Sequence, residues 1–265
     1  MKKVLGLILL LVLLLGAFSC KKKEESVVEG DVFFEVTFVT TDLPSAVTPP
    51  AAVKVKAGEA VSCPSLDVEV TAGYVLIWTK SRTSKNAYDF ASPVEEDLTL
   101  FAVEVPRTYT VTYLIEHGKN VKANPTSFTK ESETLTLKAP YMDTGYKFLR
   151  WAPYNDPDST VDAIETGTEG DVVLRAVVEP IEYVVHYLSA GDANPNPTTY
   201  LFGTTVTLEA PSKEGYVFRG YTIAEDAAKT PVTVLDPEFV AANLSKLTYR
   251  NGIDIWLQTN WEKVE

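Results

Sequence analysis

The sequence has 265 residues, 45% of them hydrophobic and 11% aromatic, and its formal net charge is −12 at pH 7. This apolar and aromatic content suffices for packed cores, so an intrinsically disordered chain is not expected. Its Lys and Arg residues form no basic stripe, which is the usual mark of a nucleic-acid-binding protein, so nucleic acid is not expected as a partner.

The first nineteen residues have the pattern of a secretory signal peptide. Lys2 and Lys3 form a positively charged start, and residues 4–18 are an uninterrupted run of apolar or small residues. That run is shorter than the ~20 residues that a membrane-spanning helix needs. Because Cys20 follows directly, residues 1–19 resemble a bacterial lipoprotein signal. An ordinary cleaved secretory signal and an uncleaved anchor are the alternatives.

The lipoprotein resemblance implies that the Cys20 thiol carries a diacylglycerol and that cleavage makes Cys20 the first residue. Ala17 and Ser19 are small, as this cleavage requires, whereas Phe18 departs from the strict motif. Two or more acyl chains hold a protein stably to a membrane. We therefore expect residues 20–31 to be a lipidated N-terminus and linker. The membrane would be a partner through Cys20, in the bacterial cell envelope at the outer membrane or cell surface.

Four short sequence blocks then recur in the same order three times, which is the mark of an internal repeat. The first block is FFEVTFV (33–39), YTVTYLI (109–115) and YVVHYLS (183–189); the second is AVSCPS (60–65), TLTLKAP (134–140) and TVTLEAP (205–211). The third block is GYVLIW (73–78), GYKFLRW (145–151) and GYVFRGY (215–221); the fourth is 98–106, 172–180 and 255–263. The repeat is about 75 residues long, so it can form a small domain with a core of its own, whereas the units of a solenoid are shorter.

The blocks predict β-strands, and the repeats predict three domains at 32–106, 107–180 and 181–265. In YTVTYLI, alternation places Tyr109, Val111, Tyr113 and Ile115 on one face, and Thr110, Thr112 and Leu114 on the other. The first repeat is the most diverged, and the third carries an insertion before its last strand. Within that insertion, residues 237–247 have a Pro-Glu start and an apolar spacing that predict a short helix.

The phrase GYKFLRW predicts a turn followed by a strand. Gly145 is expected to take a positive φ, which glycine adopts without steric cost. Tyr146, Phe148 and Arg150 should then alternate with Lys147, Leu149 and Trp151. Large aromatic side chains are efficient core formers in a small domain, so we interpret the phrase as a repeated core element. The alternative is an exposed aromatic platform that stacks on sugar rings.

Taken together, these residues resemble the Listeria–Bacteroides repeat, also called the internalin B-repeat. The second repeat carries the resemblance best, in residues 109–113, 135–140, 145–151 and 173–176, whereas the third has Tyr221 where the family usually has Trp. The resemblance implies a mainly β (α+β) chain of three tandem small β-grasp-like domains. It also implies a place on bacterial surface or secreted proteins, in adhesion, spacing or host contact. No catalytic residues come with it.

A search for chemistry finds few candidate residues, and no catalytic residue, cofactor or metal is expected. The two histidines, His117 and His186, have no Cys, Asp or second His at ligand spacing, which speaks against zinc. The acidic loop NDPDSTVD (155–162) lacks the Gly and Glu that a calcium EF-hand requires. Cys63 aligns with Leu137 and Leu208, so we expect it to be a buried small hydrophobe.

The sequence therefore predicts a non-enzymatic cell-envelope lipoprotein that serves surface adhesion, spacing or binding of a host or matrix protein. The alternative is a carbohydrate-binding lipoprotein of a glycan-uptake system. It requires exposed, coplanar aromatic rings, with Trp78, Trp151, Trp256 and Trp261 as the candidates. An envelope enzyme is a third possibility for which no residue constellation is found. If one domain has specialised for binding, the third is the best candidate.

Overall fold

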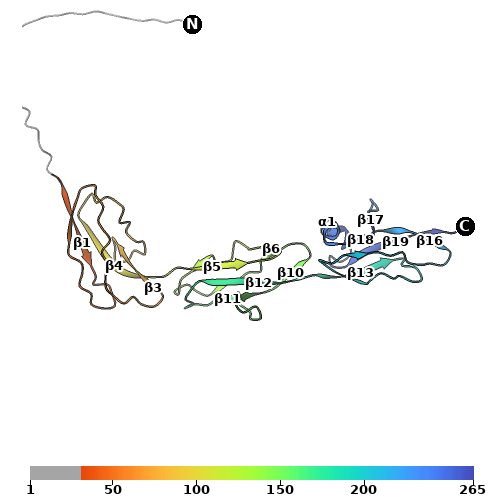
Figure 1. Cartoon of the computed structure of the whole chain (residues 1–265), viewed down its shortest axis with the longest axis horizontal. Helices are drawn as coiled ribbons and strands as arrows, with labels where there is room; N and C mark the ends of the chain where they lie inside the picture. The colour runs from red at the N-terminus through yellow and green to blue at the C-terminus, as the bar shows by residue number, and fades with distance from the viewer. Residues whose placement is uncertain (1–30) are drawn as a thin grey trace, which may run out of the picture. The chain divides into compact units, whose positions relative to one another are not determined.

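The structure is a computed structural model that describes residues 31–265 (Figure 1). The predicted signal peptide and all but the last residue of the predicted linker lie outside the described residues. The chain divides into two compact units, one of residues up to Asp67 with Trp78–Ala102, the other of Val68–Ile77 with Val103–Glu265. The second unit thus contains the second and third repeats together.

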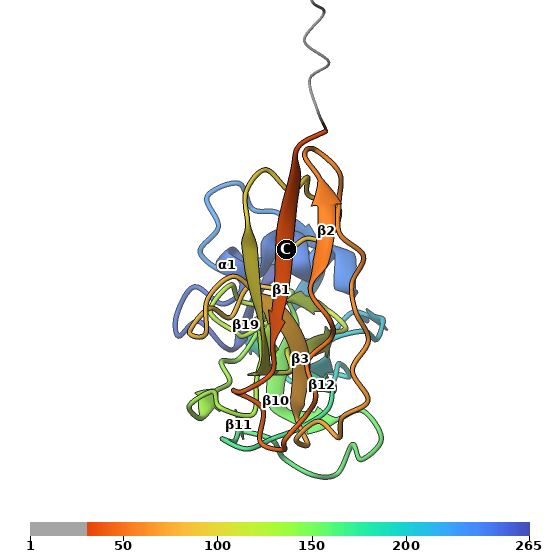
Figure 2. The same ribbon diagram turned by 90° about the vertical axis from the view of Figure 1, so that its left-hand side faces the viewer.

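The first repeat forms a four-stranded mixed sheet. Its strands are β1 (Phe33–Val39), β2 (Val53–Lys56), β3 (Tyr74–Thr79) and β4 (Leu98–Pro106). Their order is β2-β1-β4-β3, in which β1 pairs antiparallel with β2 and parallel with β4. Figure 2 shows β1 and β2 side by side.

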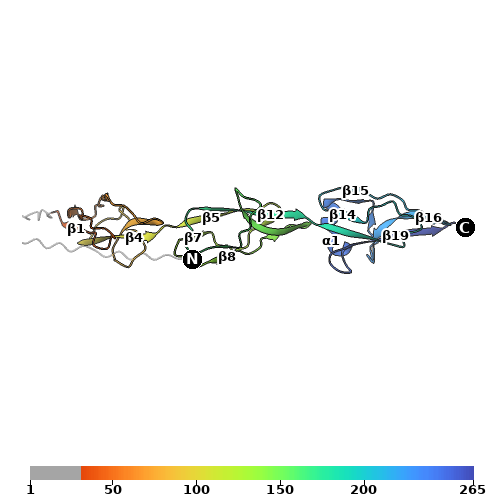
Figure 3. The ribbon, with the colours of Figure 1, turned by 90° about the horizontal axis from the view of Figure 1, so that it is seen from below.

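The second repeat has the same arrangement. Its main strands are β5 (Tyr109–Leu114), β7 (Ser127–Phe128), β10 (Tyr146–Pro153) and β12 (Val172–Pro180), in the order β10-β12-β5-β7. Again the first strand, β5, pairs parallel with the last, β12 (Figure 3). Two short pairs complete it: β6 (Gly118–Lys119) with β9 (Tyr141–Met142), and β8 (Leu135–Thr136) with β11 (Ala163–Ile164).

The third repeat adds a fifth strand and a helix to this plan. Its sheet runs β14-β13-β19-β16-β17, made of β13 (Glu182–Leu188), β14 (Thr199–Leu201), β16 (Tyr216–Ile223), β17 (Pro231–Val232) and β19 (Ile255–Lys263). The short strands β15 (Val206–Thr207) and β18 (Val234–Leu235) pair antiparallel. The parallel first-to-last pair recurs between β13 and β19. The prediction of a mainly β chain of tandem repeat domains is confirmed, whereas the β-grasp classification and the domain boundaries stay predictions.

The helix α1 (Pro237–Leu247) begins and ends where the sequence predicts it. Asp236 caps its start, because the Asp236 carboxylate accepts a hydrogen bond from the Phe239 N–H at 2.8 Å. Val240 and Leu247 are fully buried and join the core of the third repeat. The helix contacts β18 and β19 (Figure 1).

Alternation in the first block is confirmed, but the second block forms less strand than predicted. Tyr109 and Val111 are buried, and Leu114 is 42% exposed. In the second block only residues 135–136 and 206–207 form strands, and residues 60–65 contribute a single bridge from Ala60 to Pro93. The prediction of a buried Cys63 is wrong, since its side chain is exposed. Pro64, which lacks an N–H group, follows it and cannot continue a strand ladder.

The aromatic phrase is a core element, but its strict alternation is wrong. Gly145 takes a φ of +87°, as predicted. The pairing of β10 with β12 then shifts register between Phe148 and Arg150, a β-bulge that leaves Leu149 44% exposed. Because of this extra residue, Phe148 and Trp151 pack into the same core, with their ring centroids 5.4 Å apart.

A buried asparagine holds the loop that follows the first strand in the second and third repeats. Asn124 donates to the carbonyl oxygen of Lys138 at 2.9 Å and accepts from its N–H at 2.7 Å. Asn196 forms the same two bonds with Glu209, at 2.8 and 2.7 Å. Asn124 is 4% and Asn196 8% exposed, so these two buried amides find their hydrogen-bond partners in the backbone rather than in water. This contact is called the asparagine clasp below.

Candidate functional site

The tryptophan residues separate into two buried and two partly exposed side chains. Trp78 and Trp151 are 5% and 3% exposed, and each indole N–H donates to a backbone carbonyl, of Pro64 and Lys138 respectively. They are core residues, so their candidacy for a sugar-binding platform is wrong. Trp256 and Trp261 are partly exposed, and both lie on β19 of the third repeat.

Trp261 is fixed along one edge. Its indole N–H donates to the carbonyl oxygen of Ser189 at 2.7 Å, and the ring packs edge-on against Phe218 at a centroid distance of 5.9 Å. The Lys213 ammonium lies 5.9 Å from its ring centroid and 4.1 Å from that of Tyr216. These contacts make Trp261 part of a small aromatic and cationic surface at one end of β19.

Trp256 lies on the outer face of the third sheet. Its neighbours on β19, Ile255 and Leu257, are fully buried, so alternation turns Trp256 away from the core. The parallel register sets it beside His186 on β13, and the two rings stack with centroids 3.9 Å apart at an angle of 16°. The Arg250 guanidinium lies 4.4 Å from the Trp256 ring, within the range of a cation–π contact.

Acidic side chains pair with His186 and with Arg250. Asp254 lies 3.0 Å from Nε2 of His186 and accepts a hydrogen bond from Asn251 at 2.9 Å. Glu225 accepts a hydrogen bond from Arg250 at 3.0 Å. We call the six residues His186, Glu225, Arg250, Asn251, Asp254 and Trp256 the Trp256 cluster.

The electrostatics of the Trp256 cluster keep its carboxylates ionised. The hydrogen bond from His186 is the main cause that lowers the pKa of Asp254, with Asn251 adding to it. The hydrogen bond from Arg250 is the main cause that lowers the pKa of Glu225. At neutral pH both groups therefore accept hydrogen bonds and are poor proton donors. The side chains of His186 and Arg250 are 37% and 38% exposed, so an incoming partner can reach them.

The insertion of the third repeat places this cluster. Residues 248–254 follow α1 and lead into β19, and the Asn251 carboxamide oxygen accepts from the N–H groups of Ile253 and Asp254 at 3.1 and 2.9 Å. This turn sets Arg250 and Asp254 over a sheet face built by β13 and β19. Sequence reasoning named His186 and Trp256 but missed Glu225, Arg250, Asn251 and Asp254. The insertion itself was the available signal.

The remaining candidate residues lie apart from the Trp256 cluster. His117 occupies a turn with a φ of +54°, and its ring stacks on Tyr146 at 3.8 Å. Cys20 lies outside the described residues. Among residues 31–265, no group of three or more His, Cys, Asp and Glu side chains could hold a metal ion.

No helix within residues 31–265 is long and apolar enough to cross a membrane.

Comparison with known proteins gives two kinds of match. The chain is similar to a "Putative membrane protein" of Evansella cellulosilytica, with 27% identity over 173 residues, which is 63% of this chain and 25% of that protein. The chain thus matches a quarter of the length of that relative. The divergent InlB B-repeat domain matches residues 184–244. The Listeria-Bacteroides repeat domain matches residues 34–103 and 109–177, which together make up more than half of the chain. The chain accordingly belongs to the Listeria–Bacteroides repeat family and carries repeat domains of the surface-protein type.

Proposed function

We propose that this chain is a non-enzymatic, lipid-anchored protein of the bacterial cell envelope that binds a host or matrix protein. Cys20 would attach it to the membrane, the repeats would act as a scaffold, and the Trp256 cluster would form the contact surface. The observation that carries the proposal is that the insertion of the third repeat builds a partly exposed aromatic and charged cluster.

The composition of the cluster suits binding to a protein surface. Trp and Arg are the residues that most often dominate the energetics of protein interfaces. Arg250 and Glu225 can exchange their mutual ion pair for contacts with a partner, because the Glu225 side chain is 63% exposed. Ile253, also 63% exposed, adds apolar area beside them.

The first test separates location from binding. Intact cells are treated with protease and compared with lysed cells, and Cys20→Ala is compared with wild type for incorporation of labelled fatty acid. Loss of the protein from intact cells, together with Cys20-dependent labelling, is expected. Protection of the protein until lysis would contradict a role in adhesion.

The second test addresses the surface. Immobilised fibronectin, laminin and collagen serve as the probes for the purified chain and for Trp256→Ala and Arg250→Ala. Tyr154→Ala is the matched control, because Tyr154 is an aromatic residue of the second repeat that is 55% exposed. Each cluster substitution should weaken binding about tenfold or more, which corresponds to ~1.4 kcal/mol, and the control should not. Equal binding by all four proteins would count against the assigned surface.

A second candidate function is carbohydrate binding, favoured by the partial exposure of Trp256 beside two ionised carboxylates. Such carboxylates accept hydrogen bonds from sugar hydroxyl groups. Titration with soluble polysaccharides while tryptophan fluorescence is recorded distinguishes the candidates. A saturable change that Trp256→Phe removes would favour the glycan ligand over the protein ligand.

A further inference from the structure

The first repeat lacks both halves of the asparagine clasp. Pro64 corresponds to Lys138 of the second repeat. The Trp78 indole N–H donates to the Pro64 carbonyl oxygen at 3.3 Å, and the Trp151 indole N–H donates to the Lys138 carbonyl oxygen at 2.9 Å. As a proline, Pro64 has no N–H to offer an asparagine oxygen.

The asparagine itself is also replaced. Asn124 stands four residues before Phe128. Phe128 pairs with Tyr109 on β5, the first strand of the second repeat. In the first repeat the corresponding strand residue is Phe34, and its partner is Val55. Ala51 stands four residues before Val55, at the position of the asparagine. Its methyl side chain cannot form the two hydrogen bonds of an asparagine amide.

The loop that follows β1 in the first repeat surrounds a cavity of about 770 Å³. It is lined by the segment from Phe38 to Pro49, with Phe38, Leu43, Ala46, Val47 and Pro49 supplying apolar surface and Thr40 and Thr48 hydroxyl groups. The volume is within the range of about 300–1,000 Å³ typical of small-molecule sites. A second hollow of about 410 Å³ shares residues 46–48 and is also lined by Pro50, Ser65, Leu66 and Asp67.

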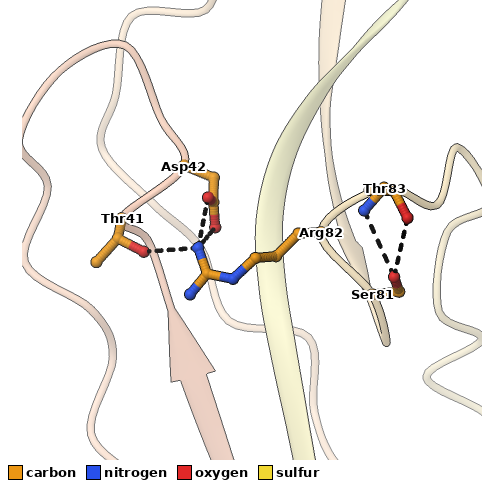
Figure 4. A network of polar contacts seen from close by, with 5 residues as sticks. All are labelled: Thr41, Asp42, Ser81, Arg82 and Thr83. Carbon is orange, nitrogen blue, oxygen red and sulfur yellow. Dashed lines mark hydrogen bonds and ion pairs between the residues drawn. The ribbon is translucent and has the colours of Figure 1, made fainter.

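The loop around the cavity is ordered by contacts of its own. The Thr40 hydroxyl donates to the Val47 carbonyl oxygen at 2.6 Å, and the Leu43 N–H donates to the Thr40 carbonyl oxygen at 3.2 Å. Arg82 donates to the Thr41 hydroxyl at 3.2 Å and to the Asp42 carboxylate at 2.5 and 2.6 Å (Figure 4). These bonds hold in place the loop that lines the cavity.

Charge decides the class of ligand. The lining residues between Phe38 and Pro49 carry no charged side chain, and the acidic residue of this loop, Asp42, is neutralised by Arg82. A charged ligand would lose its hydration against apolar walls without gaining an ion pair from this segment. A neutral ligand loses little and gains the burial of its apolar surface.

We propose that the first repeat binds a neutral, mainly apolar small molecule in this cavity. Phe38, Leu43 and Val47 supply the apolar contacts, and the hydroxyl group of Thr48 orients polar atoms at the edge of the ligand. The site is separate from the Trp256 cluster and does not depend on the function proposed for it.

The test is a fluorescence titration of the full-length chain with N-phenyl-1-naphthylamine, a neutral aromatic dye that brightens in apolar surroundings. Saturable binding with a Kd at or below about 100 μM is expected, and Val47→Glu should weaken it at least about tenfold. The matched control is Val184→Glu, which places the same charge on an exposed valine of the third repeat and should bind like wild type. Wild type and both variants all retain the apolar residues 4–18. Dye that binds to this run therefore contributes equally to each titration and does not affect the comparison.

Circular dichroism melting verifies that Val47→Glu keeps the wild-type Tm. If it does not, Thr48→Glu replaces it, since the Thr48 side chain also lines the cavity. The anionic dye 1-anilinonaphthalene-8-sulfonate should bind more weakly than the neutral dye. Equal binding of the neutral dye by wild type and the cavity variant, an absence of saturation, or tighter binding of the anionic dye would each overturn the proposal.

Discussion

The first and second repeats build the same sheet around the same tryptophan, yet they differ in the loops that cover it. In both, the first strand pairs parallel with the last, and the tryptophan packs edge-on against an aromatic ring of the first strand with centroids 5.1 Å apart. The second repeat adds the clasp of Asn124 and the short strand at 135–136. The first repeat has neither, and it carries a cavity and an exposed Cys63 instead.

This difference shows that the sheet and the loops of the repeat are separable. The sheet depends on backbone pairing and on a few large side chains, which the first repeat retains. The loop depends on two polar partners that must be present together, because an asparagine without the backbone N–H and C=O groups would leave a buried amide without these hydrogen bonds. Loss of both leaves no such penalty, so the loop is free to take another course.

The largest effect is expected from the tryptophan that the two repeats share. Trp151→Ala should cost about 3–5 kcal/mol in the free energy of unfolding, because it removes a side chain that is 3% exposed. Trp78→Ala should cost a similar amount in the first repeat. Scanning calorimetry, which can separate the transitions of individual repeats, measures both, with Tyr154→Ala as the exposed control. A much smaller loss for Trp78→Ala would show that the two cores are not equivalent.

Gly73, Gly145 and Gly215, which begin the aromatic phrase in the three repeats, should respond differently to substitution by alanine. Gly145→Ala should cost about 2–4 kcal/mol, partly for its φ of +87° and partly because a Cβ would lie 2.3 Å from the ring of Phe202, which is 7% exposed. Gly73→Ala should cost less, since its Cβ would meet the flexible ends of Lys130 and Glu169. Gly215→Ala, with a φ of +74° and open space, isolates the backbone contribution. Chemical denaturation that ranks the three otherwise would refute this account.

The clasp should have a smaller but distinct effect. Asn124→Ala should cost about 1–3 kcal/mol, because it leaves the N–H and C=O groups of Lys138 without this partner. The control is Asn155→Ala, in an exposed loop. Hydrogen exchange should accelerate at the Lys138 amide in the first variant alone. An unchanged exchange rate there would mean that the clasp does not hold the loop.

The smallest effect is expected at Cys63. Because its side chain is exposed, Cys63→Ala should change the free energy of unfolding by no more than about 0.5 kcal/mol. Leu137→Ala, at the aligned position of the second repeat, should cost about 2 kcal/mol or more, since Leu137 is 9% exposed and belongs to the core. Thiol titration should also count one fast-reacting group fewer in Cys63→Ala. Slow reaction of the Cys63 thiol would instead support the buried side chain that the alignment predicts.

Periodicity and repetition were sufficient to predict the parts of this protein that depend on local pattern. The alternation from Tyr109 to Leu114, the positive φ of Gly145 and the helix at 237–247 were all predicted correctly. Each follows from side chains or backbone preferences of neighbouring residues, which a single sequence displays directly. The family follows from the same blocks, because their order and spacing recur.

Only the tertiary structure decided which of these residues share a surface. The bulge after Phe148 depends on pairing with β12, so it set Trp151 in the core against the predicted alternation. The Trp256 cluster unites residues from β13, β19 and two loops, and the cavity of the first repeat forms where residues of the loop after β1 surround an open space. Contacts between residues far apart in the chain leave no periodic trace in the sequence, and that is the physical reason they had to be seen in space.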